Sequence, residues 1–323
     1  AKKFHGGSVK GTNTAALAFG GSDGTARIAL TETWNGTSWS EVSDMNATRS
    51  MPGGAGTNTA GLAFAGDQGA TFSQATEEWT GAGADIGAWA TSTDMNTGKR
   101  ITGGSGISTA ALNFGGFPGV ANTESWNGSA WTEVNDLNTG RGQGASMGVL
   151  YTASLFAGGP PSSALAENWN GSSWTEVGDL NNGRQQSAGA GTNTAGIVMA
   201  GRSPPGATVR AFVELWNGSS WTETTDVNTA RRSVAGTGYT NTASLLIGGY
   251  STTTVGNTEL WNGSSWTEVN DLNTVGYSAC GIGSTGSALA ITRTNPSGDT
   301  EGEPLTEDWN GNNWTEVGDL NTA

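Results

Sequence analysis

The sequence predicts an all-β fold, a closed ring of seven four-stranded antiparallel sheets called a seven-bladed β-propeller. The chain has 323 residues and 14 tryptophans, which form seven pairs with none left over. The first members of successive pairs are 45, 47, 43, 47, 45 and 48 residues apart, and such a period is typical of repeat architectures. The first and last units resemble the middle ones, which favours a ring over a capped solenoid. The pairs are Trp34/Trp39, Trp79/Trp89, Trp126/Trp131, Trp169/Trp174, Trp216/Trp221, Trp261/Trp266 and Trp309/Trp314.

The sixth repeat shows the four strands that are expected in each unit. Ser233–Gly238 is a short strand of small residues, and Ala243–Gly249 is a continuous apolar run typical of a strand buried on both faces. Asn257–Val269 predicts a hairpin, and Asn270–Thr274 predicts a crossover to the next unit. The whole chain is therefore expected to be one domain, with blades at about residues 1–45, 46–95, 96–137, 138–180, 181–227, 228–272 and 273–323.

The predicted hairpin carries the tryptophan pair. Asn262-Gly263 is a strong turn signal, because both residues tolerate positive φ angles. A two-residue loop would place Trp261 and Trp266 diagonally, and a four-residue loop would place them directly opposite. In both cases they share one face of the sheet. We therefore interpret the tryptophans as the packing unit that holds each outer hairpin to its blade, rather than as a stacking platform for a ligand.

Three recurring features resemble kelch repeats along the whole chain: the paired aromatics, a Gly-Gly pair after an apolar strand, and a basic residue after the crossover. The resemblance implies the superfamily of the galactose-oxidase propeller, and hence the fold, but no single function. The chain departs from the pattern by having Trp where kelch blades usually have Tyr, and the sixth crossover lacks the basic residue. The near-verbatim repetition also resembles, more loosely, propeller segments of phage and environmental bacterial proteins. The Gly-Gly pairs are Gly20-Gly21, Gly115-Gly116, Gly158-Gly159 and Gly248-Gly249, and the basic residues are Arg49, Arg100, Arg141, Arg184 and Arg231.

The ends of the chain bear on how the ring closes. Blade 1 is expected to begin with its inner strand and blade 7 to end with its outer strand, so that no blade combines both termini. Closure would then depend on side-chain packing between blades 1 and 7. Ala1–Lys10 lacks the apolar stretch of a signal peptide, and no run of 18 apolar residues predicts a membrane span.

Composition argues against several function classes. The net charge of −14 argues against a nucleic-acid partner, because binding phosphates needs clustered Lys and Arg. The single Cys280 cannot form an intramolecular disulfide and is predicted to be a buried thiol. The single histidine, His5, is expected at the surface or in a crossover, and it leaves no residues for a Ser/His/Asp set or a histidine-based metal site. No catalytic residue, cofactor or metal is therefore predicted.

Two carboxylates and an asparagine recur in every unit. A Glu precedes the first Trp by two residues, an Asp follows the second Trp by five, and an Asn follows that Asp by two. A ring of cation sites is one interpretation, but the Asp-x-Asn pairs lack the glycine and distal Glu of a calcium loop. We favour a structural joint that every blade repeats, with the Glu paired to a crossover Arg. The Glu residues are Glu32, Glu77, Glu124, Glu167, Glu214, Glu259 and Glu307.

Variation between the repeats is concentrated in the loops that join strands 2 and 3 of each blade. These 2–3 loops and the crossovers are expected at one end of the ring, while nearly constant turns occupy the other. A rigid frame with varied loops on one face is typical of binding surfaces, although unconstrained drift would look the same. The candidate ligand-binding residues in the 2–3 loops are Phe72, Phe117, Arg202, Phe212, Tyr250, Asp299 and Glu301.

The function predicted from these features is a non-enzymatic binding or structural module. It would recognise a glycan, a protein receptor or other subunits of an assembly through the 2–3 loops. An extracellular or virion-surface location, as in an appendage or tail fibre, is the expectation. The alternative is a carbohydrate-active enzyme, a glycoside hydrolase or lyase, that uses acidic residues on the same face.

Overall fold

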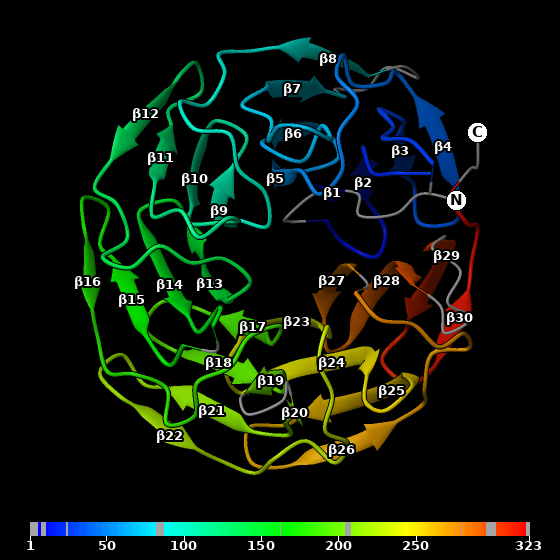
Figure 1. Ribbon diagram of the computed structural model, residues 1–323. Coiled ribbons are helices and arrows are strands. Elements are labelled where there is room, and N and C mark those ends of the chain that lie inside the picture. Colours follow the sequence, from blue (N-terminus) through cyan, green and yellow to red (C-terminus); the bar gives the residue numbers. More distant parts are fainter. Residues whose placement is uncertain are drawn as a thin grey trace.

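A computed structural model describes residues 6–7, 11–23, 25–81, 87–161, 163–203, 208–278, 280–294 and 302–320. Seven four-stranded antiparallel sheets stand around a central axis and close into a propeller, as the tryptophan period predicted (Figure 1). Strand order within each sheet follows the chain, from the innermost strand to the rim. None of the described segments is a helix long and apolar enough to cross a membrane.

The strands of blades 1 to 4 are, in order, β1 (Gly6–Gly7), β2 (Ala16–Phe19), β3 (Thr31–Trp34), β4 (Trp39–Val42); β5 (Gly53–Gly56), β6 (Ala60–Phe64), β7 (Thr76–Thr80), β8 (Ala88–Thr91); β9 (Gly103–Ile107), β10 (Ala110–Phe114), β11 (Thr123–Trp126), β12 (Trp131–Val134); β13 (Ala145–Leu150), β14 (Ala153–Ala157), β15 (Ala166–Trp169) and β16 (Trp174–Glu176). Those of blades 5 to 7 are β17 (Ala188–Gly191), β18 (Gly196–Met199), β21 (Val213–Trp216), β22 (Trp221–Glu223); β23 (Ala235–Thr240), β24 (Ala243–Tyr250), β25 (Thr254–Trp261), β26 (Trp266–Val269); β27 (Cys280–Ser284), β28 (Ser287–Thr294), β29 (Gly302–Trp309) and β30 (Trp314–Glu316). A small extra hairpin, β19 (Arg202–Ser203) and β20 (Thr208–Val209), lies in the 2–3 loop of blade 5.

Six of the outer hairpins use the four-residue loop, and blade 2 has a longer one, but in all seven the paired tryptophans lie directly opposite each other, as Trp261 and Trp266 do. The side-chain oxygen of Asn262 accepts hydrogen bonds from the backbone N–H groups of Ser264 and Ser265. Only the glycine of the pair, Gly263 with φ +94°, takes the positive φ angle. The asparagine therefore contributes as a turn acceptor and the glycine through its backbone freedom.

The first tryptophan of each pair joins the two hairpins of its own blade. All seven are at most 2% exposed, and each indole N–H donates to a backbone carbonyl in the turn between strands 1 and 2. For example, Trp216 donates to the Asn193 carbonyl at 2.9 Å. Because a buried indole N–H needs a partner, this bond aligns the outer hairpin with the inner one.

The second tryptophan joins each blade to the preceding one. In five blades its indole N–H donates to a threonine hydroxyl on strand 3 of the preceding blade, three residues before the first Trp of that blade, as Trp89 does to Thr31 at 2.9 Å. Two joints lack that threonine. Val213 occupies the position in blade 5, and Trp266 donates to the Thr225 carbonyl instead. Ala166 occupies it in blade 4, and the buried indole N–H of Trp221 has no partner among the described residues.

Ala166→Thr is therefore expected to stabilise the protein. The new hydroxyl would accept from the Trp221 indole, and a satisfied hydrogen bond contributes about 0.5–1.5 kcal/mol. Five blades already hold threonine in this fully buried position, so the side chain fits the frame. Ala166→Val, which adds the same volume without an acceptor, is the control and should give no such gain. The free energy of unfolding from urea titration checks the difference, and equal stabilities of the two variants would contradict the assignment.

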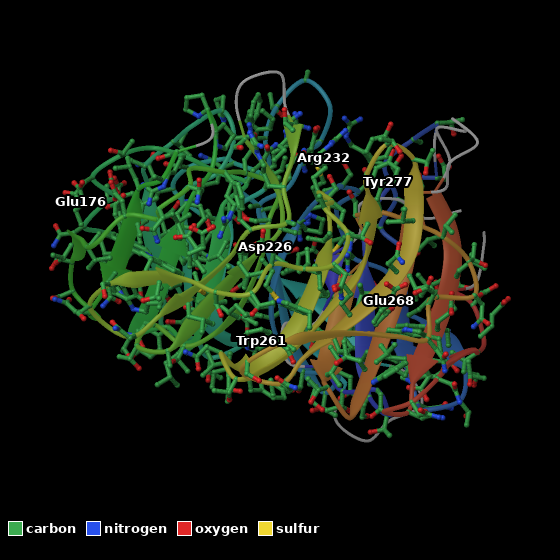
Figure 2. All side chains as sticks on the ribbon, turned by 90° about the horizontal axis from the view of Figure 1, so that it is seen from below. Glu176, Asp226, Arg232, Trp261, Glu268 and Tyr277 are labelled. Atoms are coloured by element: carbon green, nitrogen blue, oxygen red, sulfur yellow. The ribbon has the colours of Figure 1, made fainter. Side chains whose placement is uncertain are left out.

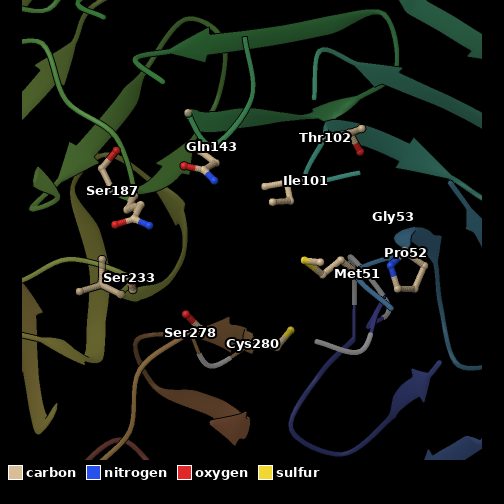
Figure 3. Close-up of a pocket in the computed structure, with 13 residues that line it drawn as sticks. Met51, Pro52, Gly53, Ile101, Thr102, Gln143, Ser187, Ser233, Ser278 and Cys280 are labelled. Carbon is tan, nitrogen blue, oxygen red and sulfur yellow. The ribbon is translucent and has the colours of Figure 1, made fainter. Parts of the chain in front are cut away.

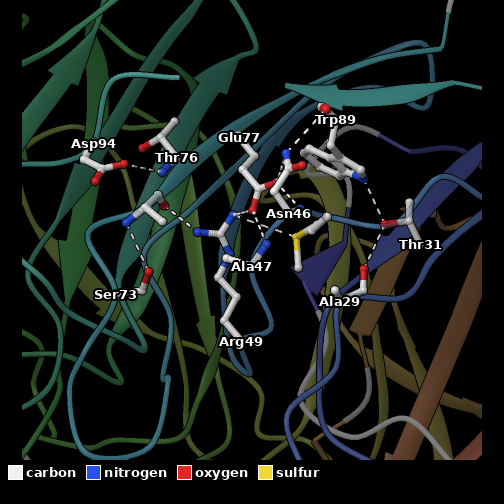
Figure 4. A network of polar contacts seen from close by, with 12 residues as sticks. Ala29, Thr31, Asn46, Ala47, Arg49, Ser73, Thr76, Glu77, Trp89 and Asp94 are labelled. Carbon is white, nitrogen blue, oxygen red and sulfur yellow. Dashed lines mark hydrogen bonds and ion pairs between the residues drawn. The ribbon is translucent and has the colours of Figure 1, made fainter. Parts of the chain in front are cut away.

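The recurring Glu forms the second half of each joint (Figure 4). At the joint between blades 1 and 2, the Glu77 carboxylate on β7 accepts from the backbone N–H and side-chain amide of Asn46 and pairs with Arg49 at 2.9 Å. Both side chains of the ion pair are at most 1% exposed. The corresponding pairs are Arg141–Glu167, Arg184–Glu214 and Arg231–Glu259. The prediction of a repeated structural salt bridge is confirmed at these four joints.

One member of that set was assigned wrongly. Lys99, not Arg100, occupies the joint between blades 2 and 3, where its ammonium lies 3.9 Å from Glu124 and donates to the Asn122 carbonyl at 2.8 Å. Burial lowers the pKa of Lys99 to about 8, although Glu124 favours the charged form. The spacing could have identified it, because in the four arginine joints the cation follows the recurring Asp by five residues, and Lys99 follows Asp94 by five. Arg100 lies instead near the surface, where it forms part of the site described below.

The joint between blades 7 and 1 repeats the tryptophan–threonine contact of the other joints. Blade 1 is built from β1–β4 and blade 7 from β27–β30, so neither sheet takes a described strand from the opposite end of the chain. The Trp39 indole of blade 1 donates to the Thr306 hydroxyl of blade 7 at 2.9 Å. Trp39 also shares a buried cluster with Ile282, Leu289 and Ile291 of blade 7. Closure by side-chain packing is therefore confirmed for these residues.

Candidate functional site

The 2–3 loops and the crossovers lie at one end of the ring, which we call the loop face. In side view Arg232 and Tyr277 lie toward this end and Trp261 toward the other (Figure 2). A cavity of about 530 Å³ opens here around the central axis, within the usual range for a small-molecule site (Figure 3). Its walls are the first residues of the inner strands and the chain just before them, including Pro52, Thr102, Ser187, Val234 and Cys280.

Six equivalent residues surround the cavity, and we call them the mouth ring. Each stands two positions after the joint cation or its replacement, and each lines the cavity. All six have φ angles between 51° and 57°, in the left-handed region that residues other than glycine seldom adopt. A left-handed backbone conformation costs about 1–2 kcal/mol for a residue with a side chain, so tertiary contacts must impose this conformation at all six positions. The mouth ring consists of Met51, Ile101, Gln143, Gln186, Ser233 and Ser278.

Backbone hydrogen bonds link neighbouring members of the mouth ring across the blade joints. The Gln186 N–H donates to the Gln143 carbonyl at 3.2 Å, the Ser233 N–H to the Gln186 carbonyl at 3.0 Å, and the Ser278 N–H to the Ser233 carbonyl at 2.8 Å. In blades 5, 6 and 7 the left-handed turn thus directs the N–H toward the preceding blade. These bonds hold the backbone of the cavity wall in one conformation, so the side chains decide what it can bind.

The side chains of the mouth ring differ in chemistry from one side to the other. Blades 2 and 3 contribute the apolar Met51 and Ile101, blades 4 and 5 contribute the amides of Gln143 and Gln186, and blades 6 and 7 contribute serine hydroxyls. Amides and hydroxyls donate and accept hydrogen bonds without carrying charge. The cavity can therefore hold a ligand with one apolar and one neutral polar side.

The structure brings two of the predicted loop residues together. The rings of Phe72 and Phe117 are 6.0 Å apart at nearly right angles, and the Arg100 guanidinium lies 5.2 and 5.0 Å from their centroids. Phe117 remains 43% exposed. The Asp67 carboxylate pairs with Arg100 at 2.5 Å and with Arg27 at 2.9 Å, which ties together the loop faces of blades 1, 2 and 3.

The other predicted aromatics also stand beside arginines. The Arg210 guanidinium lies 5.5 Å from the Phe212 ring, and that of Arg232 lies 4.8 Å from the Tyr250 ring, distances at which cation–π attraction operates. Arg202 is half-buried, and its backbone pairs with Gln185 in both directions, at 2.9 and 3.0 Å. The predicted Asp299 and Glu301 lie outside the described residues, as does His5.

Sequence reasoning missed the mouth ring and the arginines beside the aromatics. The mouth ring had a sequence signal, because its position carries Met, Ile, Gln, Gln, Ser and Ser within otherwise similar repeats. It was overlooked because a set of six left-handed residues that contains no glycine is not revealed by its amino-acid composition. Arg100 and Arg232 were missed because their aromatic partners are 17 or more positions away in the chain.

Cys280 lines the cavity wall, and although the residue as a whole is half-buried, its thiol is buried as predicted (Figure 3). Burial of its thiol raises the pKa to about 11. Because the thiolate is the reactive form, its reaction with a disulfide reagent at pH 7 should be slow. We expect the rate to rise about tenfold per pH unit from pH 7 to 10, as a pKa near 11 requires. Absorbance of released thionitrobenzoate measures it, with Cys280→Ser as the blank, and a plateau below pH 9 would contradict the raised pKa.

The described part of the chain contains no group of three or more His, Cys, Asp or Glu side chains placed to hold a metal. The cavity lining contains neither a carboxylate nor a histidine among the described residues. The chemistry that this arrangement offers is therefore hydrogen bonding and apolar contact within the cavity, with cationic and aromatic groups around it.

Comparisons with known proteins support the fold. No protein-family model and no curated protein matches the chain. Among solved structures, that of YjhT is similar with a TM-score of 0.64, and the match covers 84% of this chain and 98% of YjhT at 12% sequence identity. At that identity the similarity concerns the propeller architecture alone.

Proposed function

We propose that the protein is a non-enzymatic binding module that recognises a glycan through the loop face, as part of an extracellular or virion-surface structure. The observation that carries the proposal is the mouth ring. Six residues share one strained backbone conformation and surround one cavity, yet their side chains differ. Strained residues that surround a cavity are a typical feature of ligand sites.

A glycan fits this cavity better than an apolar ligand does. A sugar ring presents hydroxyl groups along its edge and C–H groups on its faces. Gln143, Gln186 and the two serines can bond the hydroxyls, while Met51 and Ile101 offer apolar contact on the other side. The partly exposed Phe117 ring gives a further apolar surface on the loop face.

A glycan array probed with the intact ring tests the proposal, together with an assay for released reducing sugar on every glycan that binds. Binding without release is the expected result. Release of sugar would instead support the alternative, a glycoside hydrolase or lyase. Failure to bind any glycan would contradict glycan recognition and leave a protein partner as the other candidate for this face.

A further inference from the structure

The positive charge of the described surface is gathered on the loop face. Ten Lys and Arg side chains are described. Five of them are buried in the joints, each at most 1% exposed. The other five, Arg27, Arg100, Arg202, Arg210 and Arg232, all lie on the loop face. Exposed glutamates occupy the outer strands at the rim, namely Glu41, Glu133, Glu176, Glu223, Glu268 and Glu316. The same face also carries exposed crossover aspartates, such as Asp179 and Asp226, so the charge that favours an anion is local to the arginines without carboxylate partners.

We propose that the loop face binds anionic glycans, with a carboxylate or sulfate group held by Arg202 and Arg232 beside Gln186. This inference rests on the proposed function and deepens it by naming the class of glycan. A charged hydrogen bond from a guanidinium to such a group is stronger than the neutral bonds that the cavity alone can make.

Arg232 is held in position for this role. Its guanidinium lies 4.8 Å from the Tyr250 ring and donates to the side-chain oxygen of Gln186 at 3.0 Å. Gln186 belongs to the mouth ring, so the bond places Arg232 at the edge of the cavity. A guanidinium that is already ordered loses less conformational entropy on binding, and its other N–H groups stay available as donors.

Arg202 approaches the same edge from blade 5. Its backbone pairs with Gln185, the neighbour of Gln186, and its buried Nε has no hydrogen-bond partner among the described residues. The buried hydroxyl of Ser187, which lines the cavity, lacks one as well. A buried polar group without a partner is costly, and a ligand acceptor in the cavity could satisfy the Ser187 hydroxyl. Neither Arg202 nor Arg232 forms an ion pair with a carboxylate of the described chain.

The arginines on the opposite side of the cavity differ in this respect. Arg27 and Arg100 both pair with Asp67, which is 7% exposed and also accepts from the Gly69 N–H at 2.7 Å. Their charge is thus partly neutralised by the protein itself. Arg27 is a matched control, because Arg27→Gln and Arg232→Gln remove the same charge from the same face.

The test measures binding of three polymers with one backbone, namely dextran, carboxymethyl-dextran and dextran sulfate, to the full chain at 50 mM salt. We expect at least one of the two anionic polymers to bind about tenfold tighter than dextran, and we expect the difference to shrink at high salt. The two anionic arms distinguish a carboxylate from a sulfate ligand. Arg232→Gln should weaken binding of the anionic polymer about tenfold, Arg232→Lys should weaken it less, and Arg27→Gln should weaken it less than twofold. All three variants should keep their melting temperatures.

Equal binding of all three polymers would overturn the inference, as would a failure of both anionic polymers to bind. Equal losses in Arg232→Gln and Arg27→Gln would overturn it too, because they would indicate a diffuse charge effect without a site. Binding of neutral glycans on the array would still support the proposed function in each case, so the two failures are distinguishable.

Discussion

Replacing Arg231 with alanine is expected to lower the free energy of unfolding by about 3–5 kcal/mol, the usual effect of breaking a buried ion pair. Arg231 is fully buried and pairs with Glu259. It also donates to the carbonyls of Gly248 and Thr229 at 2.9 Å and of Leu246 at 3.3 Å. Alanine would leave the Glu259 carboxylate buried without its cation and remove three further bonds. Urea titration with tryptophan fluorescence measures the loss.

Arg184→Ala at the preceding joint serves as a graded comparison. The Arg184 guanidinium lies 3.1 Å from Glu214 and donates to the Val198 carbonyl, but its Nε and Nη1 have no hydrogen-bond partners among the described residues. We therefore expect a smaller loss than for Arg231→Ala. Glu223→Ala, on an exposed outer strand, should stay within about 0.5 kcal/mol of the parent. Unchanged stability of Arg231→Ala would refute the role assigned to the joints.

Trp39→Ala is expected to open the ring as well as destabilise it. Loss of a buried tryptophan costs about 3–5 kcal/mol, and Trp39 is 5% exposed in the joint between blades 7 and 1. Among the described residues, neither blade takes a strand from the other end of the chain, and side-chain contacts such as that of Trp39 with Thr306 join the two blades. Small-angle scattering should therefore show a larger radius of gyration for the variant.

Trp131→Ala is the matched control for ring opening. Trp131 is also 5% exposed and donates to the Thr76 hydroxyl at 2.8 Å, but a crossover connects blades 2 and 3. It should lose similar stability while the folded protein keeps its radius of gyration. A compact Trp39→Ala variant, with the same radius as the control, would show that closure depends on other contacts.

The repeat period allowed most of the frame to be predicted. Residues equivalent to Trp261 and Glu259 stand at fixed offsets in every unit, so a residue that every blade needs can be recognised from its repetition. The exceptions were harder to see. Ala166 in place of threonine leaves Trp221 without a partner, and Lys99 replaces an arginine in the joint. The unpartnered Trp221 indole depends on contacts between blades, which the period alone does not specify, whereas Lys99 could have been found from its spacing to Asp94.

The candidate site could be predicted only in part. The loop face was expected to carry Phe72 and Phe117, and the structure places them side by side on adjacent blades. Their shared contact with Arg100 was not expected, because Arg100 had been assigned to a joint. The mouth ring was missed because the left-handed backbone at Gln186 results from tertiary hydrogen bonds around the cavity, rather than from local sequence.

The central claim is that the ligand occupies the cavity within the mouth ring. Cys280 is the single cysteine of the chain and lines that cavity, so its reactivity reports occupancy directly. The measurement is the rate of Cys280 modification at pH 9, with and without saturating amounts of the tightest-binding glycan of the array. The account predicts that the bound glycan slows the reaction severalfold. An unchanged rate, with glycan binding verified in the same sample, would contradict it.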